Sequence, residues 1–351
     1  MAHMHELRVW NSTDDSMDDF PLEGYDRVAA LIASIVGVVF STVLNLLNLI
    51  ILPRIPNRFG ENGRLCLHCL AVVDIFGGLA CFGSRVVFEI ERAFLTSNSI
   101  VCNVVGASCT VFVSQSTWIL FVISVDRYIA VTRPMHYVSI LTYRRMKALI
   151  VTAMLMGLTL ALTRTTHMAV NGSCDFDHGA THYVNNPAIT LYSAIVLFFG
   201  SIATALNVRI LHIAHRHRNW IADYASKQQH RPRHDAATSP KPGKISGSKY
   251  RGVITVAILV GAFYLVWTPH TVGTIAAAAT GRTIPEAAYF TIVWIAFSNH
   301  WLNAIIYFFF NKAYRTAVVN LAKRRRNPFS QIQETVFTVD TFVPKQLPQI
   351  E

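Results

Sequence analysis

Residues 28–53 read VAALIASIVGVVFSTVLNLLNLIILP, 26 consecutive residues without Asp, Glu, Lys or Arg. A helix needs about 20 mainly apolar residues to cross the hydrocarbon of a bilayer, so this stretch is long enough to span a membrane. Six further stretches carry at most one charge each. They are residues 65–84, 93–125, 148–163, 183–208, 252–280 and 287–311. Because a backbone in lipid must satisfy its hydrogen bonds within one segment, the pattern predicts an all-α membrane protein, a seven-helix bundle.

The composition of the whole chain supports this class. Of the 351 residues, 52% are apolar and 15% are charged, and the mean hydropathy is +0.36. A soluble domain carries about 25% charged residues. This excludes disordered, collagen-like and small disulfide-framework proteins. The sequence also has no Walker-type loop, zinc-ligand spacing or nucleophile elbow, so we do not expect an enzyme.

The distribution of basic residues predicts the orientation in the membrane. With the N-terminus outside, the inner segments hold 25 of the 31 Lys and Arg residues and the outer segments hold 6. Positive charge favours the cytoplasmic side, so we expect a plasma-membrane, multi-pass protein with an extracellular N-terminus. Residues 1–27 then form an extracellular tail, residues 28–320 the membrane domain, and residues 321–351 a cytoplasmic tail. A basic inner segment at about 216–249, rich in His, Pro, Gly and Ser, predicts a flexible loop.

The net charge of +11 belongs mainly to this asymmetry. The basic residues flank the spans, so we expect them to meet membrane lipids rather than nucleic acid. Two glycosylation sequons, at Asn11 and Asn171, both fall on the expected outer side.

Cys102 and Cys174 also face the outer, oxidising side, and we expect them to form a disulfide. The other four cysteines lie within spans, where we expect them to pack in the core. They are Cys66, Cys69, Cys81 and Cys109.

The inner end of the third span carries the most specific motif. It reads Ser124-Val125-Asp126-Arg127-Tyr128 and continues to Arg133-Pro134-Met135-His136-Tyr137. In this place the motif closely resembles the rhodopsin-like (class A) G-protein-coupled receptors. The resemblance covers roughly residues 28–320. It includes Asn45, the Leu70-Ala71-Val72-Val73-Asp74 run, Phe263, Trp267 and Pro269 at their family spacing, and Asn303-Ala304-Ile305-Ile306-Tyr307.

The resemblance implies a role for each of these positions. The seventh helix would run through Asn311 and Tyr314-Arg315 into a short amphipathic eighth helix. Asp126, Arg127 and Tyr128 would make the G-protein coupling site, with Arg127 paired to Asp126 at rest. An activation switch would consist of Phe263, Trp267, Pro269, Asn303 and Tyr307.

The resemblance implies no cofactor other than an allosteric sodium ion. Its oxygen ligands would come from Asp74, Ser116, Asn299 and Asn303. The alternative is a structural Asp74 that is protonated or hydrogen-bonded, because a carboxylate inside the membrane must be neutralised or paired.

Several positions depart from the family pattern. Ala304 stands where the seventh helix usually has Pro, and the fourth span has no Trp. The fifth span lacks the mid-helix Pro and the inner Tyr. Lys249 occupies a place in the sixth helix where family members often carry an acid, which pairs with the arginine that corresponds to Arg127. Such changes blur the subfamily.

The ligand pocket is the least defined part of the sequence. Cys109 stands where aminergic members carry an Asp, and Phe297 stands where opsins carry the retinal-binding Lys. The candidate lining of the outer cavity is Arg85, Cys109, Tyr264, His270, Tyr289 and Trp294. Arg85 either binds a carboxylate or phosphate or pairs with Glu89 four residues later. The aromatic residues either line the pocket or pack in the core.

We therefore expect a receptor that couples an unidentified extracellular ligand to a heterotrimeric G protein by a population shift. Its basal activity would be raised, because Lys249 would repel Arg127. The alternative is a receptor-like binding or scaffold protein with weak or no G-protein signalling. A transporter should show two related halves, and the sequence shows no internal repeat.

The C-terminal tail generates a first prediction. Thr335, Thr338 and Thr341 recur every third residue beside Glu334 and Asp340. Phosphorylation by receptor kinases would add about −1.5 to −2 charges at each site, a pattern suited to the basic row of an arrestin. We expect replacement of the three Thr by Ala to abolish agonist-driven arrestin recruitment and to leave G-protein coupling intact. Undiminished recruitment by the triple variant would refute phosphorylation at these sites as the signal.

Overall fold

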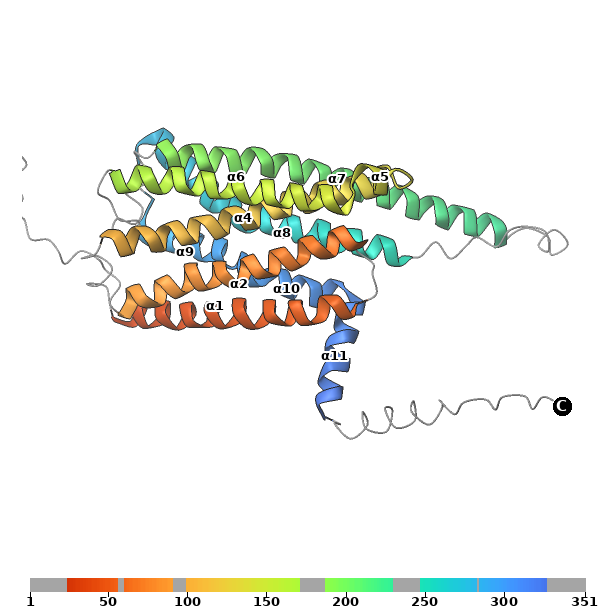
Figure 1. Cartoon of the computed structure of the whole chain (residues 1–351), viewed down its shortest axis with the longest axis horizontal. Coiled ribbons are helices and arrows are strands. Elements are labelled where there is room, and N and C mark those ends of the chain that lie inside the picture. Colours follow the sequence, from red (N-terminus) through yellow and green to blue (C-terminus); the bar gives the residue numbers. More distant parts are fainter. Residues whose placement is uncertain are drawn as a thin grey trace, which may run out of the picture.

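The computed structural model describes residues 24–55, 60–90, 99–170, 187–229, 247–282 and 284–326. Within these ranges the chain is helical and contains no strand. The long helices lie side by side along one axis, and α11 leaves one end of the bundle at a steep angle (Figure 1). The helices are α1 (Gly24–Ile51), the 3₁₀ helix η1 (Leu52–Arg54), α2 (Gly60–Ile90), α4 (Ser99–Thr132), α5 (Tyr137–Ile140), α6 (Tyr143–Val170), α7 (Pro187–Gln229), α8 (Gly247–Thr280), α9 (Glu286–Phe297), α10 (Asn299–Phe310) and α11 (Lys312–Arg326).

The predicted seven-span bundle is confirmed. In the described ranges, six helices are long and apolar enough to cross a membrane, and α9 with α10 makes the seventh as one bent span. The predicted eighth helix is α11. Its first turn is capped by Asn311, whose Oδ1 accepts hydrogen bonds from the backbone N–H of Ala313 (3.0 Å) and Tyr314 (3.3 Å).

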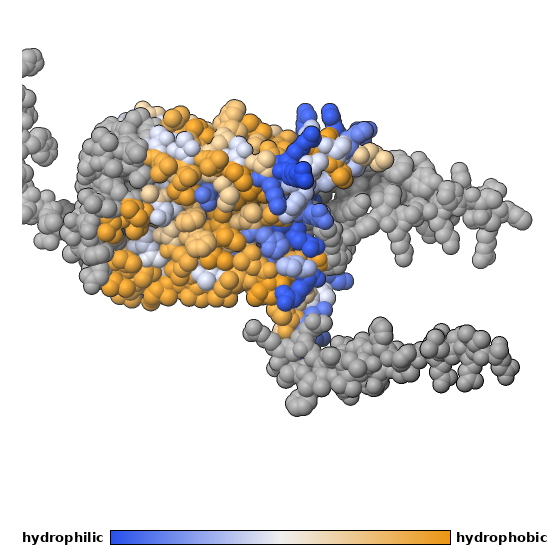
Figure 2. All heavy atoms as spheres, viewed as in Figure 1, coloured by the Kyte–Doolittle hydropathy of each residue, from blue (hydrophilic) through white to orange (hydrophobic). Residues whose placement is uncertain are grey.

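Helix α1 shows why the bundle forms in lipid. Its apolar side chains face outward at helical spacing, among them Ile32, Val36 and Val43, which are 57%, 44% and 55% exposed. Its polar side chains are fully buried on the opposite face: Ser34, Ser41, Asn45 and Asn48. The same distribution covers the visible body of the bundle, which is apolar, whereas hydrophilic residues gather at the end from which α7 and α11 emerge (Figure 2). The helices therefore pair through their polar faces and turn their apolar faces to the hydrocarbon.

The helix ends differ from the span limits expected from charge. The fourth span, expected at residues 148–163, lies in α6, which begins at Tyr143 and continues to Val170. Helix α4 begins at Ser99 and continues past Arg127 to Thr132. The reason is physical: a charged residue ends the part of a helix that sits in hydrocarbon, but the helix itself continues into water.

On the inner side, too, helices continue past the limits expected from charge. The loop expected at about 216–249 is helical at both ends, because α7 continues to Gln229 and α8 begins at Gly247. The end of the membrane domain expected at residue 320 falls within α11, which continues to Arg326, and this limit stays a prediction. Basic side chains are good helix formers in water, so a run of them does not mark a helix end.

The seventh span is bent by 50° between α9 and α10, at Ser298. Pro would be the usual cause of such a bend, but Ala304 stands at the family's Pro position and the bend lies six residues earlier. The Ser298 hydroxyl donates a 2.6 Å hydrogen bond to the Ile295 carbonyl, which competes with the helix ladder there. Helix α10 begins directly after the bend, and its first two residues, Asn299 and His300, are buried among the other helices.

The contact between α1 and α2 generates a second prediction. A Cβ placed on Gly78 of α2 would overlap Oγ and Cβ of Ser41 in α1. We expect Gly78→Ala to force these helices apart and to lower the free energy of unfolding by about 1–3 kcal/mol. The melting temperature of the purified protein should fall by several degrees. Gly83→Ala is the matched control, because a Cβ at Gly83 of α2 meets nothing within 4 Å. An equal effect of the two variants would contradict this packing.

Candidate functional site

The carboxylate of Asp74 lies at the centre of the bundle and is fully buried. Ser116 of α4 donates a hydrogen bond to its Oδ1 over 3.0 Å, and Asn303 of α10 donates one to its Oδ2 over 2.6 Å. The ring of His300, also in α10, brings Nδ1 within 3.2 Å of Oδ1. Three helices therefore meet at one carboxylate, which is the arrangement that a buried charge needs.

The predicted sodium ligands come together around this carboxylate. Asn299 donates through Nδ2 to Ser116 Oγ over 3.3 Å, so Asp74, Ser116, Asn299 and Asn303 form one buried cluster. Two oxygens of the cluster suit a hard cation: Ser116 Oγ, and Asn299 Oδ1, which is buried without a hydrogen-bond partner. The imidazole of His300, however, is a nitrogen group in contact with the carboxylate that an ion would bind. The cluster therefore does not match an all-oxygen cation site.

A row of hydrogen bonds links this cluster to α11. Asn45 of α1 donates to the backbone carbonyl of His300 over 2.6 Å and accepts from Asn48 through Oδ1 over 3.2 Å. Asn48 in turn accepts a 2.7 Å hydrogen bond from the Tyr314 hydroxyl. The eighth helix is thus connected to the centre of the bundle through side chains that are all buried.

A second polar site lies at the inner end of α4. The guanidinium of Arg127 donates through Nε to Asp126 Oδ2 over 2.7 Å and forms a closer second contact through Nη2. The other carboxylate oxygen, Oδ1, accepts a 2.6 Å hydrogen bond from the Tyr137 hydroxyl at the start of α5. The predicted resting pair of Arg127 and Asp126 is present, with both residues buried.

Asn62 of α2 fixes Tyr137 in this place. Its Nδ2 donates to the Leu141 carbonyl over 2.7 Å and lies 3.3 Å from the Tyr137 hydroxyl oxygen. Burial, and then the hydrogen bond to Asp126, raise the pKa of Tyr137 to about 12. Because the folded pKa lies above the usual value of about 10, the donated bond is fully present below pH 10 and is lost only as the pH rises through 12. Tyr137 is therefore a constant donor at physiological pH.

Comparison with known sequences decides the family of this bundle. The family described as 7 transmembrane receptor (rhodopsin family) matches residues 60–307, which include both polar sites. The chain belongs to the rhodopsin family of seven-transmembrane receptors. The proteins of this family are receptors, so this chain is a receptor and not an enzyme.

Individual relatives are distant and differ among themselves. Histamine H2 receptor of Canis lupus familiaris is 25% identical over 73% of this chain and 69% of its own length. Trace amine-associated receptor 4 of Rattus norvegicus is 25% identical over 83% of this chain and 84% of its own. G-protein coupled receptor 52 of Bos taurus is 24% identical over 73% and 70%. The chain is thus similar to several subfamilies at once and is assigned to none of them.

The residues expected to form an activation switch lie along α8 and α10. Phe263 and Trp267 pack together with ring centroids 6.1 Å apart, and Pro269 follows two residues after Trp267 inside α8. Tyr307 packs against Tyr314 at 6.0 Å, and its hydroxyl is buried without a hydrogen-bond partner. Asn303 donates its hydrogen bond to Asp74. Tyr128 is half-buried beside the Arg127 pair.

One expectation about the cysteines is wrong. Cys81 of α2 and Cys109 of α4 do not merely pack in the core, because they form a disulfide with a Cα–Cα distance of 5.0 Å. Cys66 and Cys69 carry free thiols, as expected for core packing. The proposed pocket residue Cys109 therefore presents a disulfide sulfur and not a thiol.

The remaining pocket candidates have separate neighbourhoods. Arg85 forms the alternative 3.0 Å ion pair with Glu89 and stacks on the rings of Phe88 and Phe290. Trp294 packs on Phe82 at 5.2 Å. Both Arg85 and Trp294 are half-buried, and each is packed against neighbouring side chains.

Further along α8, His270 packs edge-on against Trp267 at 5.5 Å. Tyr264 lies over Gly200 of α7 and lines a groove of about 550 Å³ between α7 and α8. Tyr289 is half-buried in α9. The candidate set thus divides among several contacts, which favours core packing over a shared ligand cavity for the aromatic residues.

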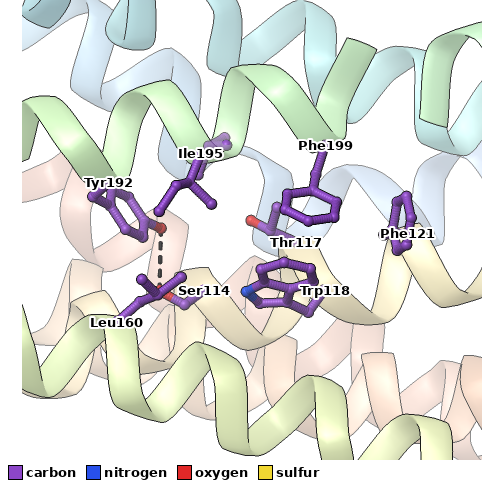
Figure 3. Close-up of a pocket in the computed structure, with 9 residues that line it drawn as sticks. Ser114, Thr117, Trp118, Phe121, Leu160, Tyr192, Ile195 and Phe199 are labelled. Carbon is purple, nitrogen blue, oxygen red and sulfur yellow. Dashed lines mark hydrogen bonds between the residues drawn. The ribbon is translucent and has the colours of Figure 1, made fainter. Parts of the chain in front are cut away.

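A small cavity lies between α4, α6 and α7, with Tyr192 hydrogen-bonded to Ser114 over 3.1 Å (Figure 3). Its volume of about 10 Å³ would hold one water at most, so it is not a ligand site. Trp118 of α4 packs edge-on against Phe199 of α7, with ring centroids 4.5 Å apart, and also reaches Gly157 of α6. Trp118 of the third span thus places an indole between α4, α6 and α7.

Several expected sites lie outside the part of the structure that can be described. The backbone of Cys102 belongs to α4, but its side chain and the whole of Cys174 fall outside the described residues, so their disulfide stays a prediction. Other expected sites also fall outside the described residues and stay predictions: Asn11, Asn171, the Lys249 side chain, Thr335, Thr338 and Thr341.

Two contacts between helices were not predicted from the sequence, although the register of the helices against one another could have indicated them. Helices α2 and α4 run antiparallel and meet at Asp74 and Ser116. Seven residues up α2 is Cys81, and seven residues back along α4 is Cys109, so two turns from the contact the thiols face each other. His300 lies three residues before Asn303, on the same face of α10. No such signal identifies Tyr137, because its approach to Asp126 depends on the turn between α4 and α5.

Proposed function

We propose that this receptor lies in the plasma membrane with its N-terminus outside and couples an extracellular ligand to a heterotrimeric G protein. The observation that supports this proposal is the buried Asp126–Arg127 pair with its Tyr137 donor at the inner end of α4. The side chain of Arg127 is 8% exposed, so its charge is not accessible to a partner in this state. Breaking the pair would free Arg127 to meet a partner at the inner face.

The proposed mechanism is a shift between resting and active populations. A hydrogen bond to a charged group contributes about 1.5–3 kcal/mol, and every 1.4 kcal/mol changes a population ratio tenfold. The bonds on Asp126 are therefore strong enough to set the resting fraction. A ligand activates only by binding the active state more tightly, and the G protein does the same from the inside.

The chemistry of the ligand differs from that of the amine receptors among the relatives. In the resemblance to aminergic members, a third-helix Asp binds the amine, and here that position is Cys109 in a disulfide with Cys81. A disulfide offers no counter-charge to an ammonium group. We therefore propose a ligand that is not a simple amine held at this position. Proposed inner partners are the receptor kinases and arrestin at the tail, and anionic lipids at the basic end of α11.

The inner network generates the experiment that tests this function. Tyr137→Phe removes the hydroxyl that donates to Asp126, so we expect the ratio of active to resting receptor to rise about tenfold. The measurement is basal G-protein dissociation in cells at equal surface expression, across a panel of heterotrimers. Tyr143→Phe is the matched control, since that exposed tyrosine packs against Lys147 through its ring. Arg127→Ala should abolish dissociation in either background.

Two outcomes would count against G-protein coupling. One is the absence of dissociation from every heterotrimer, for the wild type with tissue extract and for Tyr137→Phe without it. This result would support the binding or scaffold protein instead. The other is full signalling by Arg127→Ala, which would remove Arg127 from the coupling site.

Lys249 generates a separate prediction about basal activity. It lies in α8 at a place where relatives often carry an acid that pairs with the triplet arginine, and a lysine would repel Arg127 instead. We expect Lys249→Glu to lower basal dissociation severalfold, since a charge pair near the surface contributes up to about 1 kcal/mol. Basal output that is unchanged or raised at equal expression would contradict this role of Lys249.

A further inference from the structure

We propose that the ring of His300 occupies the place beside Asp74 that a sodium ion would take. The receptor would then hold its central carboxylate with side chains of its own, without the ion. This inference goes beyond the proposed function and does not depend on signalling.

The first support is the position of the ring. His300 is fully buried and its Nδ1 lies 3.2 Å from Asp74 Oδ1, a distance that leaves no room for a third atom between them. With Ser116 on the same oxygen and Asn303 on the other, donors of the protein already surround the carboxylate.

The second support is the space made for the ring. A Cβ on Gly77 would overlap the ring of His300, with Nδ1 2.7 Å and Nε2 3.0 Å away. Only glycine at this position of α2 lets the imidazole lie against Asp74. The fit of the ring into α2 is therefore a property of the fold and not of one flexible side chain.

The third support is the character of the two groups that face the ring nitrogens. Nδ1 faces a carboxylate. Nε2 lies 3.9 Å from Cys81 Sγ, which belongs to the disulfide and so has no hydrogen to donate. Nδ1 thus faces an acceptor, which suits a ring N–H at that nitrogen. The ring therefore meets Asp74 as a hydrogen-bond donor, in the place where a cation would meet the carboxylate.

The test compares sodium chloride with choline chloride at the same ionic strength, using the purified full-length receptor and its melting temperature. We expect the wild type to melt at the same temperature in both salts. His300→Ser removes the ring and leaves a hydroxyl oxygen, so this variant should gain a sodium-specific rise. At a sodium concentration tenfold above the dissociation constant, the rise should be about 2–4 °C. Adding Asp74→Asn should remove it.

The matched control is His68→Ser, which replaces a half-buried histidine of α2 that bonds the Arg64 carbonyl. It should show no sodium response. If His300→Ser does not fold, Gly77→Ala displaces the same ring, and Gly83→Ala is its control on the same helix. The inference is overturned if the wild type is stabilised by sodium and loses this response with Asp74→Asn. It is also overturned if neither His300→Ser nor Gly77→Ala acquires a sodium response.

Discussion

The hydrogen-bonded carboxylate of Asp74 is the interaction on which the rest of this bundle depends. Hydrocarbon offers a charged group no solvation, so an uncompensated carboxylate there would cost several kcal/mol. Its donors come from α4 and α10 and include both Ser116 and His300. Meeting that requirement brings the three helices together, and the 50° bend at Ser298 turns the polar start of α10 toward the carboxylate without the usual proline.

The central cluster and the inner site share one rigid element. Ser116 and Asp126 lie ten residues apart on α4, which is about 15 Å along a helix. On the other side of the bundle, the hydrogen bonds from His300 through Asn45 and Asn48 reach Tyr314 of α11. A movement of α10 relative to α2 would therefore disturb both the hydrogen bonds at Asp74 and those that lead from His300 to Tyr314. Such an arrangement suits a protein with two discrete states, because buried polar networks are either satisfied or broken.

The sequence alone predicts most of this fold and about half of the site, for physical reasons. Uncharged stretches mark the spans because charge is costly in lipid, and the triplet at Asp126 marks the inner end of one span. Charge does not report where a helix ends in water, as α7 shows by continuing to Gln229. Contacts between helices depend on register, so the Cys81–Cys109 disulfide and the place of His300 become clear only when α2, α4 and α10 are placed side by side.

The central claim is that the ring of His300 takes the place of a cation at Asp74. Nitrogen-15 NMR of the histidine rings of the purified receptor tests this most directly, with the signal among the 14 histidines assigned by comparison with His300→Asn. The account predicts one ring N–H of His300 that is protected from solvent exchange, shifted far downfield by the carboxylate, and lost in Asp74→Asn. A His300 ring whose N–H exchanges freely, or whose signal is unchanged in Asp74→Asn, would contradict it.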